Sequence, residues 1–404
     1  MALLPPLIAF SFALLTAWIL SKIFGAPPSS GRFASIDGLR GYLAFGVFTH
    51  HGAVWYDFLH TGEWRLPSSF IYTNLGQASV VLFFMITGFL FCTKVLRGRS
   101  ERINWYKLYL SRLLRLLPLY TFAILLMLLT VGIITRFQLV EPAFLFSKSL
   151  FKWASFTVMG YPDLNGLKMT SIIVGTVTWT LPYEWFFYFI LPLIAVLAGA
   201  ATPRRFILGA LLIVAFMIYR MRPDLVYLAT FFGGIVAAVL VHFDLIHKAC
   251  RGIGGSIAAS ISLLVAITCF RSAYQFIPIV LLTVAFTMIA AENTLFGILA
   301  WPTSRFLGQL TYSIYLLHGI MLFWIFRFVI GFAHGASLSL VQHWSVMCLS
   351  IPFLISGCYA TFRFIELPGM RSVSRFVSWY HEHLNPVMRR YSHRIPARTR
   401  ATPV

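Results

Sequence analysis

The chain has 404 residues, of which 59% are hydrophobic and only 11% are charged, and its mean hydropathy is +0.81. Long uncharged runs recur throughout, which is typical of a polytopic membrane protein and excludes a soluble globular domain. The 32 Lys and Arg outnumber the 12 Asp and Glu. They lie mostly between apolar runs, which follows the positive-inside rule and does not indicate a nucleic-acid-binding surface.

Apolar runs of about 17 to 25 residues predict about eleven transmembrane helices, so the expected fold class is an all-α helix bundle. The runs lie near 3–22, 36–56, 73–93, 113–135, 178–199, 206–220, 225–243, 253–270, 275–292, 306–330 and 341–362. The stretch 136–177 is expected to contain a re-entrant or interfacial helix. Residues 1–24 have no basic segment before the apolar run, which favours a retained helix with its N-terminus outside over a removed signal peptide.

Two basic regions predict the orientation of the chain. Residues 94–115 carry seven Lys and Arg against Glu101, and eight arginines follow from position 363 onward against Glu366 and Glu382. Eight predicted spans separate the two regions, so both are expected in the cytoplasm. The tail 372–404 is then a basic cytoplasmic segment, and its Pro, Arg and Ser content after Asn385 predicts poor order.

The segment "DGLRGYLAFGVFTHHG", residues 37–52, places Arg40 and His51 eleven residues apart. On a helix this spacing puts both side chains on one face, about 16 Å apart along the axis. A helix N-terminus with an added guanidinium is suited to an anion. Alternatively, Arg40 reaches lipid phosphate or pairs with Asp37, and His51 makes a packed hydrogen bond between helices.

Further ionisable residues lie within or beside the predicted spans. "SRLLRLLP" places Arg112 and Arg115 on one side of a helix at the cytoplasmic boundary, where they either anchor the helix or form a phosphate clamp with Arg40. Glu184 lies in an apolar run and is expected either to orient a catalytic histidine or to tie two helices together. His318 also lies within a predicted helix, as a site residue or as a buried histidine bonded to a neighbouring hydroxyl.

Glu366 ends the last predicted span, and we expect it to pair with a nearby arginine, Arg363 or Arg371. "FFMITGFL" around Gly88 predicts a close helix–helix contact through small residues. The five cysteines stand singly with no C-x-x-C pair, so we expect neither a metal site nor a disulfide framework.

Several of these segments together resemble the membrane acyltransferase family 3 proteins. "IDGLRGYLAFGVFTHH" is similar to the family's opening signature, an Arg followed after ten residues by His, and "FFMITGFL" resembles its FF-x-x-S-G-F-L segment with Thr87 in place of Ser. "SRLLRLLPLY", "WTLPYEWFFYFILP", "LTYSIYLLHG" and "FIELPGMR" resemble later motifs, in family order. The likeness covers residues 33–371. The family core has about ten helices, so residues 1–24 form an added span, and the C-terminal SGNH-type domain of some members is missing.

The resemblance implies a multipass enzyme that moves an acyl group, usually acetyl, from cytosolic acyl-CoA to a hydroxyl of a carbohydrate such as O-antigen or exopolysaccharide. The expected location is a bacterial inner membrane, and no metal is required. By the same resemblance, Arg40 and His51 are the essential pair, and Arg112 and Arg115 belong to the donor site.

The mechanism we expect uses the arginines to hold the phosphates of acyl-CoA and His51 as general base or transient acyl carrier. Glu184 and His318 are the further catalytic candidates, Glu184 by fixing the tautomer of the histidine. A transporter or flippase for a lipid-linked glycan is the alternative. Transporters often contain internal repeats and broken helices, and no repeat is found in this sequence.

Overall fold

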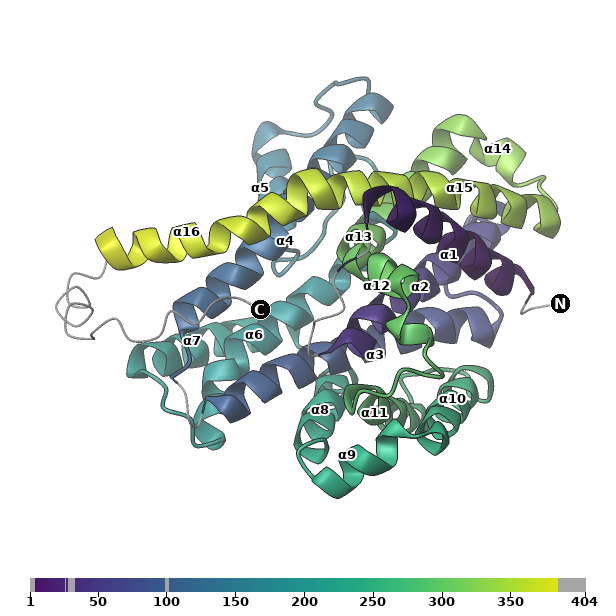
Figure 1. Ribbon diagram of the computed structural model, residues 1–404. Coiled ribbons are helices and arrows are strands. Elements are labelled where there is room, and N and C mark those ends of the chain that lie inside the picture. The colour runs from purple at the N-terminus through teal and green to yellow at the C-terminus, as the bar shows by residue number, and fades with distance from the viewer. Residues whose placement is uncertain (1–3, 26, 28–32, 99–101, 384–404) are drawn as a thin grey trace.

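The computed structural model describes residues 4–25, 27, 33–98 and 102–383 (Figure 1). Residues 384–404 of the predicted tail lie outside the described residues. The described part contains helices and no strand, which confirms the all-α bundle. In chain order the elements are α1 (Leu4–Phe24), α2 (Ala34–Thr61), α3 (Phe70–Arg97), α4 (Trp105–Ile134), α5 (Ala143–Ala154), η1 (Thr170–Val174), η2 (Val177–Trp179), α6 (Thr180–Leu197), α7 (Arg204–Met221), α8 (Leu225–Leu240), α9 (Asp244–Arg251), α10 (Ile253–Thr268), α11 (Phe276–Ala290), η3 (Ile298–Ala300), α12 (Pro302–Gln309), α13 (Thr311–Trp324), η4 (Ile325–Val329), α14 (Phe332–Gly335), α15 (Leu340–Thr361), η5 (Phe362–Glu366) and α16 (Leu367–His383).

Every apolar run that predicted a transmembrane segment is helical, although the run 306–330 breaks at Leu310 between α12 and α13. The stretch 136–177 contains the helix α5. Among the described residues, six helices are long and apolar enough to cross a membrane, or seven if α8 and α9, bent by 104°, count as one broken span. The helices α2 and α7 contain charged residues and are not among these six. The helices α10 and α11 have only 16 and 15 residues, about 24 and 23 Å, which is shorter than a hydrocarbon core of about 30 Å.

The helices pack closely because small residues occur where backbones meet. Gly88 of α3 lies against the carbonyl oxygen of Phe231 in α8, and a side chain at Gly88 would collide with that oxygen. This confirms the small-residue contact predicted around Gly88. Gly41 of α2 faces the backbone of α12 at Leu307 in the same way. These close approaches hold α3 against α8 and α2 against α12.

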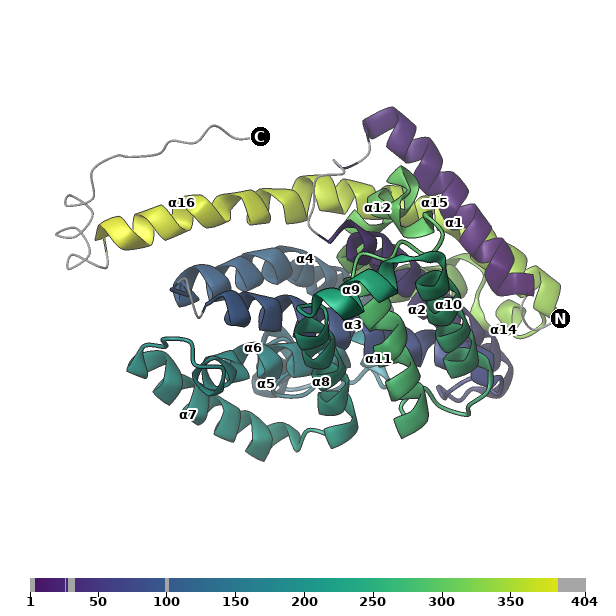
Figure 2. The same ribbon diagram turned by 60° about the horizontal axis from the view of Figure 1, so that its bottom comes forward.

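The predicted extra helix α1 lies on the outside of the bundle (Figure 2). It packs against α12 and α15 through Ala9, Ala13 and Ala17, which are fully buried and four residues apart. Large apolar side chains such as Leu7 and Trp18 on its other face are exposed, as expected for a surface in contact with lipid.

The last span continues into a second helix without a sharp bend. Within α15, η5 and α16, the 40 residues Leu340–Trp379 form one candidate span. At 1.5 Å per residue this is about 60 Å, twice the thickness of a hydrocarbon core. The helix α16 packs against α4 and extends past the other helices (Figures 1 and 2).

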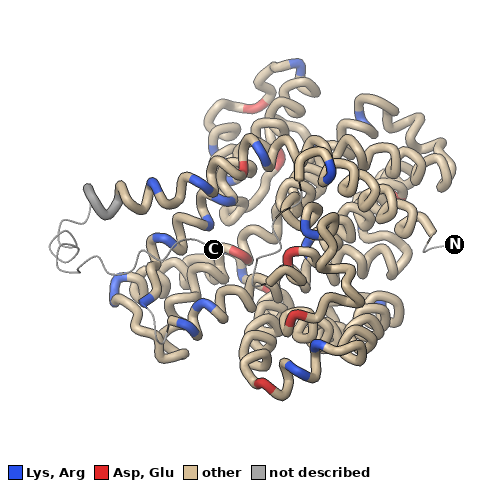
Figure 3. The backbone as a smooth tube through the Cα atoms, in the orientation of Figure 1, with Lys and Arg blue, Asp and Glu red and all other residues tan. Residues whose placement is uncertain are grey.

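Basic residues gather toward one end of the bundle. Figure 3 shows Lys and Arg along α16, at the beginning of α4 and at the beginning of α7, at the left of the view. The same end holds the C-terminus of α3, with Lys94 and Arg97 in its last turn. We refer to it below as the basic end.

Candidate active site

A pair of buried histidines joins α2 to α13. His51 is 7% exposed and His318 is fully buried. His318 Nε2 lies 3.1 Å from His51 Nδ1, although the two residues are 267 positions apart in the chain. His51 Nδ1 also lies 3.0 Å from the carbonyl oxygen of Val47, and His318 Nδ1 lies 2.8 Å from that of Ile314.

These contacts determine which ring nitrogens carry protons when both rings are neutral. A carbonyl oxygen can only accept, so the proton of His318 stays on Nδ1 and donates to Ile314. His318 Nε2 is then an acceptor, and the hydrogen on His51 Nδ1 is shared between it and Val47. In this tautomer, His51 Nε2 carries no proton, and its lone pair is what a general base or a nucleophile requires.

Backbone packing places the two rings. Gly319, next to His318, lies directly against the backbone of Val174 and Gly175 in η1 and its C-cap. Gly175 adopts φ +61°, a left-handed conformation that glycine tolerates, and its position faces the ring edge of His51. The segment that carries η1 and η2 therefore forms a wall of the histidine site.

An aromatic residue covers His51 on the side of the loop that follows α2. The Trp64 ring stacks on the His51 ring with 6.4 Å between centroids and 25° between planes. Trp64 is itself held edge-to-face by Trp55 and Phe58. Trp64 could not be predicted as a site residue, because a tryptophan in a loop carries no pattern that indicates its partner.

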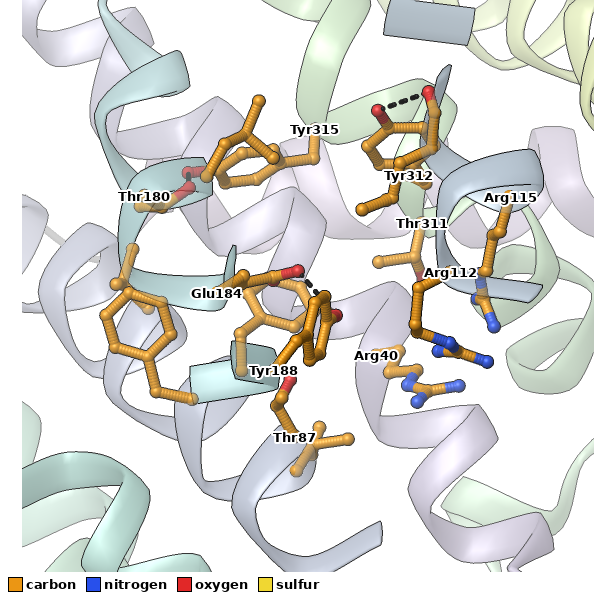
Figure 4. Close-up of a pocket in the computed structure, with 16 residues that line it drawn as sticks. Arg40, Thr87, Arg112, Arg115, Thr180, Glu184, Tyr188, Thr311, Tyr312 and Tyr315 are labelled. Atoms are coloured by element: carbon orange, nitrogen blue, oxygen red, sulfur yellow. Dashed lines mark hydrogen bonds between the residues drawn. The ribbon is translucent and has the colours of Figure 1, made fainter. Parts of the chain in front are cut away.

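Arg40, Arg112 and Arg115 line one pocket, with a cavity volume of about 110 Å³ (Figure 4). Their guanidinium groups gather on one side, and Glu184 and Tyr188 lie opposite. The pocket draws its walls from α2, α3, α4, α6 and α13. Its other polar lining residues are Thr87, Thr180, Thr311, Tyr312 and Tyr315.

The arginines have few anionic partners in this pocket. Arg40 Nη1 lies 3.1 Å from Asp37 Oδ1. This is the ion pair that the sequence offered as one alternative for Arg40. The carboxyl group of Asp37 is half exposed. Arg112 packs over the Phe91 ring at 5.3 Å. Three guanidinium groups beside one partly buried carboxylate, that of Glu184, leave an excess of positive charge, which suits a ligand with several phosphates.

Glu184 belongs to the arginine pocket and does not hydrogen-bond to His51. Its Oε2 accepts a hydrogen bond of 2.9 Å from Tyr188 Oη, one turn further along α6. The Nδ1 atom of His51 contacts Val47 and His318 instead. The partner that fixes the His51 tautomer is thus His318, and Tyr188 is a pocket residue that the sequence analysis missed, although the spacing of four residues from Glu184 would have placed both on one helix face.

Tyr315 connects the arginine pocket with the histidine pair. It lines the pocket, and its hydroxyl contacts Thr180 Oγ1 at 2.9 Å and donates to the Val177 carbonyl at 3.0 Å. Its ring lies 6.5 Å from the ring of His318, one turn away on α13. Contacts through Tyr315 and His318 therefore connect the arginine pocket with His51.

The expected ion pair of Glu366 with a neighbouring arginine is not found among the described residues. The carboxylate is buried, and Ser313 Oγ donates to it from α13. Ser313 also contacts Thr361 at 3.0 Å. The π-helix η5 turns Glu366 inward, so this residue ties α15 to the helix that carries His318.

No group of three or more His, Cys, Asp or Glu gathers at one point in the described part of the chain. The fold is that of a polytopic membrane protein, and its helices place a pocket lined by three arginines near a pair of buried histidines. The chain belongs to acyltransferase family 3, because the profile of this acyltransferase domain matches residues 33–363. It is therefore a membrane acyltransferase. No curated protein and no solved structure matches the sequence significantly.

Proposed function

We propose that the protein is an O-acyltransferase, most simply an O-acetyltransferase, that moves an acyl group from cytosolic acyl-CoA to a hydroxyl of a cell-surface polysaccharide or glycolipid such as O-antigen or exopolysaccharide. One observation carries the proposal. The pocket with three arginines reaches Tyr315, and Tyr315 packs beside His318, the partner of His51.

The arginine pocket is the donor side in this proposal. Arg40, Arg112 and Arg115 bind phosphate oxygens of acyl-CoA through charge-assisted hydrogen bonds. Tyr188 and Glu184 line the opposite wall. The pantetheine arm then runs past Tyr315 and brings the thioester carbonyl to His51.

His51 supplies the acid–base chemistry. Its Nε2 takes the proton of the acceptor hydroxyl as the oxygen attacks the thioester carbonyl, and a tetrahedral intermediate forms. When the C–S bond breaks, the imidazolium returns the proton to the departing thiolate, giving the ester and free CoA thiol. His318 Nε2 accepts from His51 Nδ1 and so stabilises the imidazolium between these two steps.

The orientation follows from the charge pattern. Basic residues at the ends of α3, α4 and α16 favour the cytosol under the positive-inside rule. Under this assignment the C-terminus is cytoplasmic, the N-terminus is periplasmic, and the enzyme lies in the inner membrane of a bacterium. The Trp64 side of His51 then faces the periplasm.

The test uses full-length protein in lipid nanodiscs with acetyl-CoA labelled in the acetyl group and a surface glycan fraction as acceptor. His51→Ala should abolish label transfer while the thermal unfolding profile stays that of the wild type. The Arg112→Ala, Arg115→Ala double variant should raise KM for acetyl-CoA by about two to four orders of magnitude, if each lost charge-assisted bond costs about 1.5–3 kcal/mol. Arg271→Ala, an exposed arginine outside the pocket, is the matched control.

Retained transfer in His51→Ala would refute the chemical role of this residue, and an unchanged KM in the double variant would refute the arginine clamp. Passage of the glycan across a membrane without acetyl label would instead favour the transporter.

A further inference from the structure

A second cavity lies on the far side of α6 from the arginine pocket. It has a volume of about 670 Å³, which is in the range of sites that hold one small molecule. Four helices contribute to it, together with the segment after α5. The lining residues are Tyr106, Tyr109, Leu110, Leu113, Ser155, Phe156, Val158, Met159, Trp185, Phe189, Phe216 and Val377. We call it the α4–α7 groove.

The groove is suited to hydrocarbon. Its lining is aromatic and aliphatic, apart from the Ser155 hydroxyl and two tyrosine phenols. The helices α4 and α6, which form its long walls, are candidate membrane spans. On α7, the neighbours Leu208 and Leu212 are 61% and 73% exposed, as on a lipid-facing helix. A cavity with such walls in a bilayer takes up apolar chains.

One end of the groove is positively charged. The Arg205 guanidinium lies 5.0 Å from the centroid of the Tyr106 ring, which is itself part of the lining. Lys107 follows Tyr106 in the chain and is exposed. On α16, exposed Arg375 lies two residues before Val377, which lines the groove. Figure 3 shows basic residues gathered over these elements.

We propose that the α4–α7 groove binds the hydrocarbon chain of an anionic phospholipid, with the lipid phosphate beside Arg205. The apolar walls select a chain, and the cations at the basic end select a negative headgroup. The helix α16 adds an exposed apolar face with Phe376 and Trp379 beside its arginines, which is the composition of a helix that lies at a membrane interface.

The groove shares a wall with the arginine pocket. On one turn of α6, Glu184 and Tyr188 face the arginines, whereas Trp185 and Phe189 face the groove. Tyr109 of the groove donates from its hydroxyl to the backbone carbonyl of Tyr188 at 3.2 Å. A bound lipid chain thus supports the helix turn that carries two pocket residues. This link to activity rests on the proposed function, whereas lipid binding does not.

The experiment is photo-cross-linking of the full-length chain in vesicles that contain phosphatidylglycerol with a diazirine in one acyl chain. Phosphatidylcholine with the same chain is the comparison. Label should concentrate in peptides covering 106–113 and 155–159, and phosphatidylglycerol should exceed phosphatidylcholine about fivefold or more. That factor corresponds to about 1 kcal/mol for each basic residue near an anionic headgroup.

Two variants separate the chain site from the headgroup site. Leu110→Trp should fill the groove and reduce label in both peptides at least fivefold, and Leu113→Trp does the same from the next turn if the first variant fails to fold. Leu212→Trp, on the exposed face of α7, should leave labelling unchanged. Arg205→Gln should lower phosphatidylglycerol labelling to the phosphatidylcholine level, whereas Arg327→Gln should not.

Four results would overturn the proposal. The first is equal labelling of the groove peptides and of the exposed α7 face. The second is equal labelling by the two lipids. The third is undiminished labelling in a folded, groove-filling tryptophan variant. Competition by a prenyl phosphate but not by unlabelled phosphatidylglycerol would also contradict it. None of these readouts depends on acyl transfer, so the lipid site and the proposed function can fail separately.

Discussion

The hydrogen bond between His51 and His318 allows a quantitative prediction. His318 has no route to the substrate in the proposed chemistry except through His51, so it is a positioning residue. Replacement of His318 by Leu keeps an apolar volume on α13 and removes the acceptor for His51 Nδ1–H. The bond matters most when His51 is an imidazolium, because hydrogen bonds to charged groups contribute about 1.5–3 kcal/mol.

At about 1.4 kcal/mol for each factor of ten, His318→Leu should lower kcat about 10- to 150-fold. KM for acyl-CoA should stay close to the wild-type value, since the arginine pocket is untouched. His318→Gln can place an amide oxygen near the former Nε2 position and accept the same hydrogen bond, so it should recover most of the loss.

The assay is steady-state acyl transfer by purified protein in nanodiscs, with thermal unfolding of each variant measured alongside. If the Leu and Gln variants are both folded and have equal kcat, then a hydrogen-bond acceptor at position 318 does not contribute to kcat. A wild-type kcat in His318→Leu would refute the reasoning altogether.

Three further predictions follow from the packing around the site. Gly319→Ala should lower the free energy of unfolding by about 1–3 kcal/mol, because the new methyl group meets the backbone of η1. Gly357→Ala is the control, since Gly357 has open space around it. Equal melting temperatures for the two variants would contradict this prediction. Ser313→Ala should destabilise the protein by about 1–3 kcal/mol in denaturant unfolding, since Glu366 loses its buried donor, and adding Glu366→Gln should restore part of the loss. Trp64→Ala should raise KM for the glycan acceptor and leave KM for acyl-CoA unchanged; a change in the donor KM alone would place Trp64 on the wrong side of the site.

Much of the fold could be predicted from the sequence because the membrane imposes a strong length and polarity requirement. Each apolar run became a helix for this reason. The break at Leu310 could not be predicted, because the few polar residues beside it, such as Gln309 and Thr311, do not interrupt an apolar run of this length. The π-turn at η5 was also missed, and with it the inward position of Glu366.

The parts of the site that could be predicted are those whose positions depend on a single helix or on the side of the membrane. Arg112 and Arg115 are three residues apart on α4, and the charge pattern put Arg40 on the same membrane face, where the structure brings all three into one pocket. Their binding of acyl-CoA remains a proposal. The partner of His51 depends instead on how α2 and α13 pack, which no local pattern encodes. Glu184 was considered as its orienting group, but helix packing gives that contact to His318.

In the proposed reaction, α2 sets the distance between Arg40, which binds phosphate of the donor, and His51, which does the chemistry. An α-helix neither stretches nor shortens appreciably, so the spacing of eleven positions keeps the two residues about 16 Å apart along the axis. A small activated acyl compound such as acetyl phosphate is too short to contact Arg40 and His51 at the same time. Discrimination against short donors would then need no contact with the acyl group itself, and the identity of the transferred chain would be free to change without rebuilding the helix.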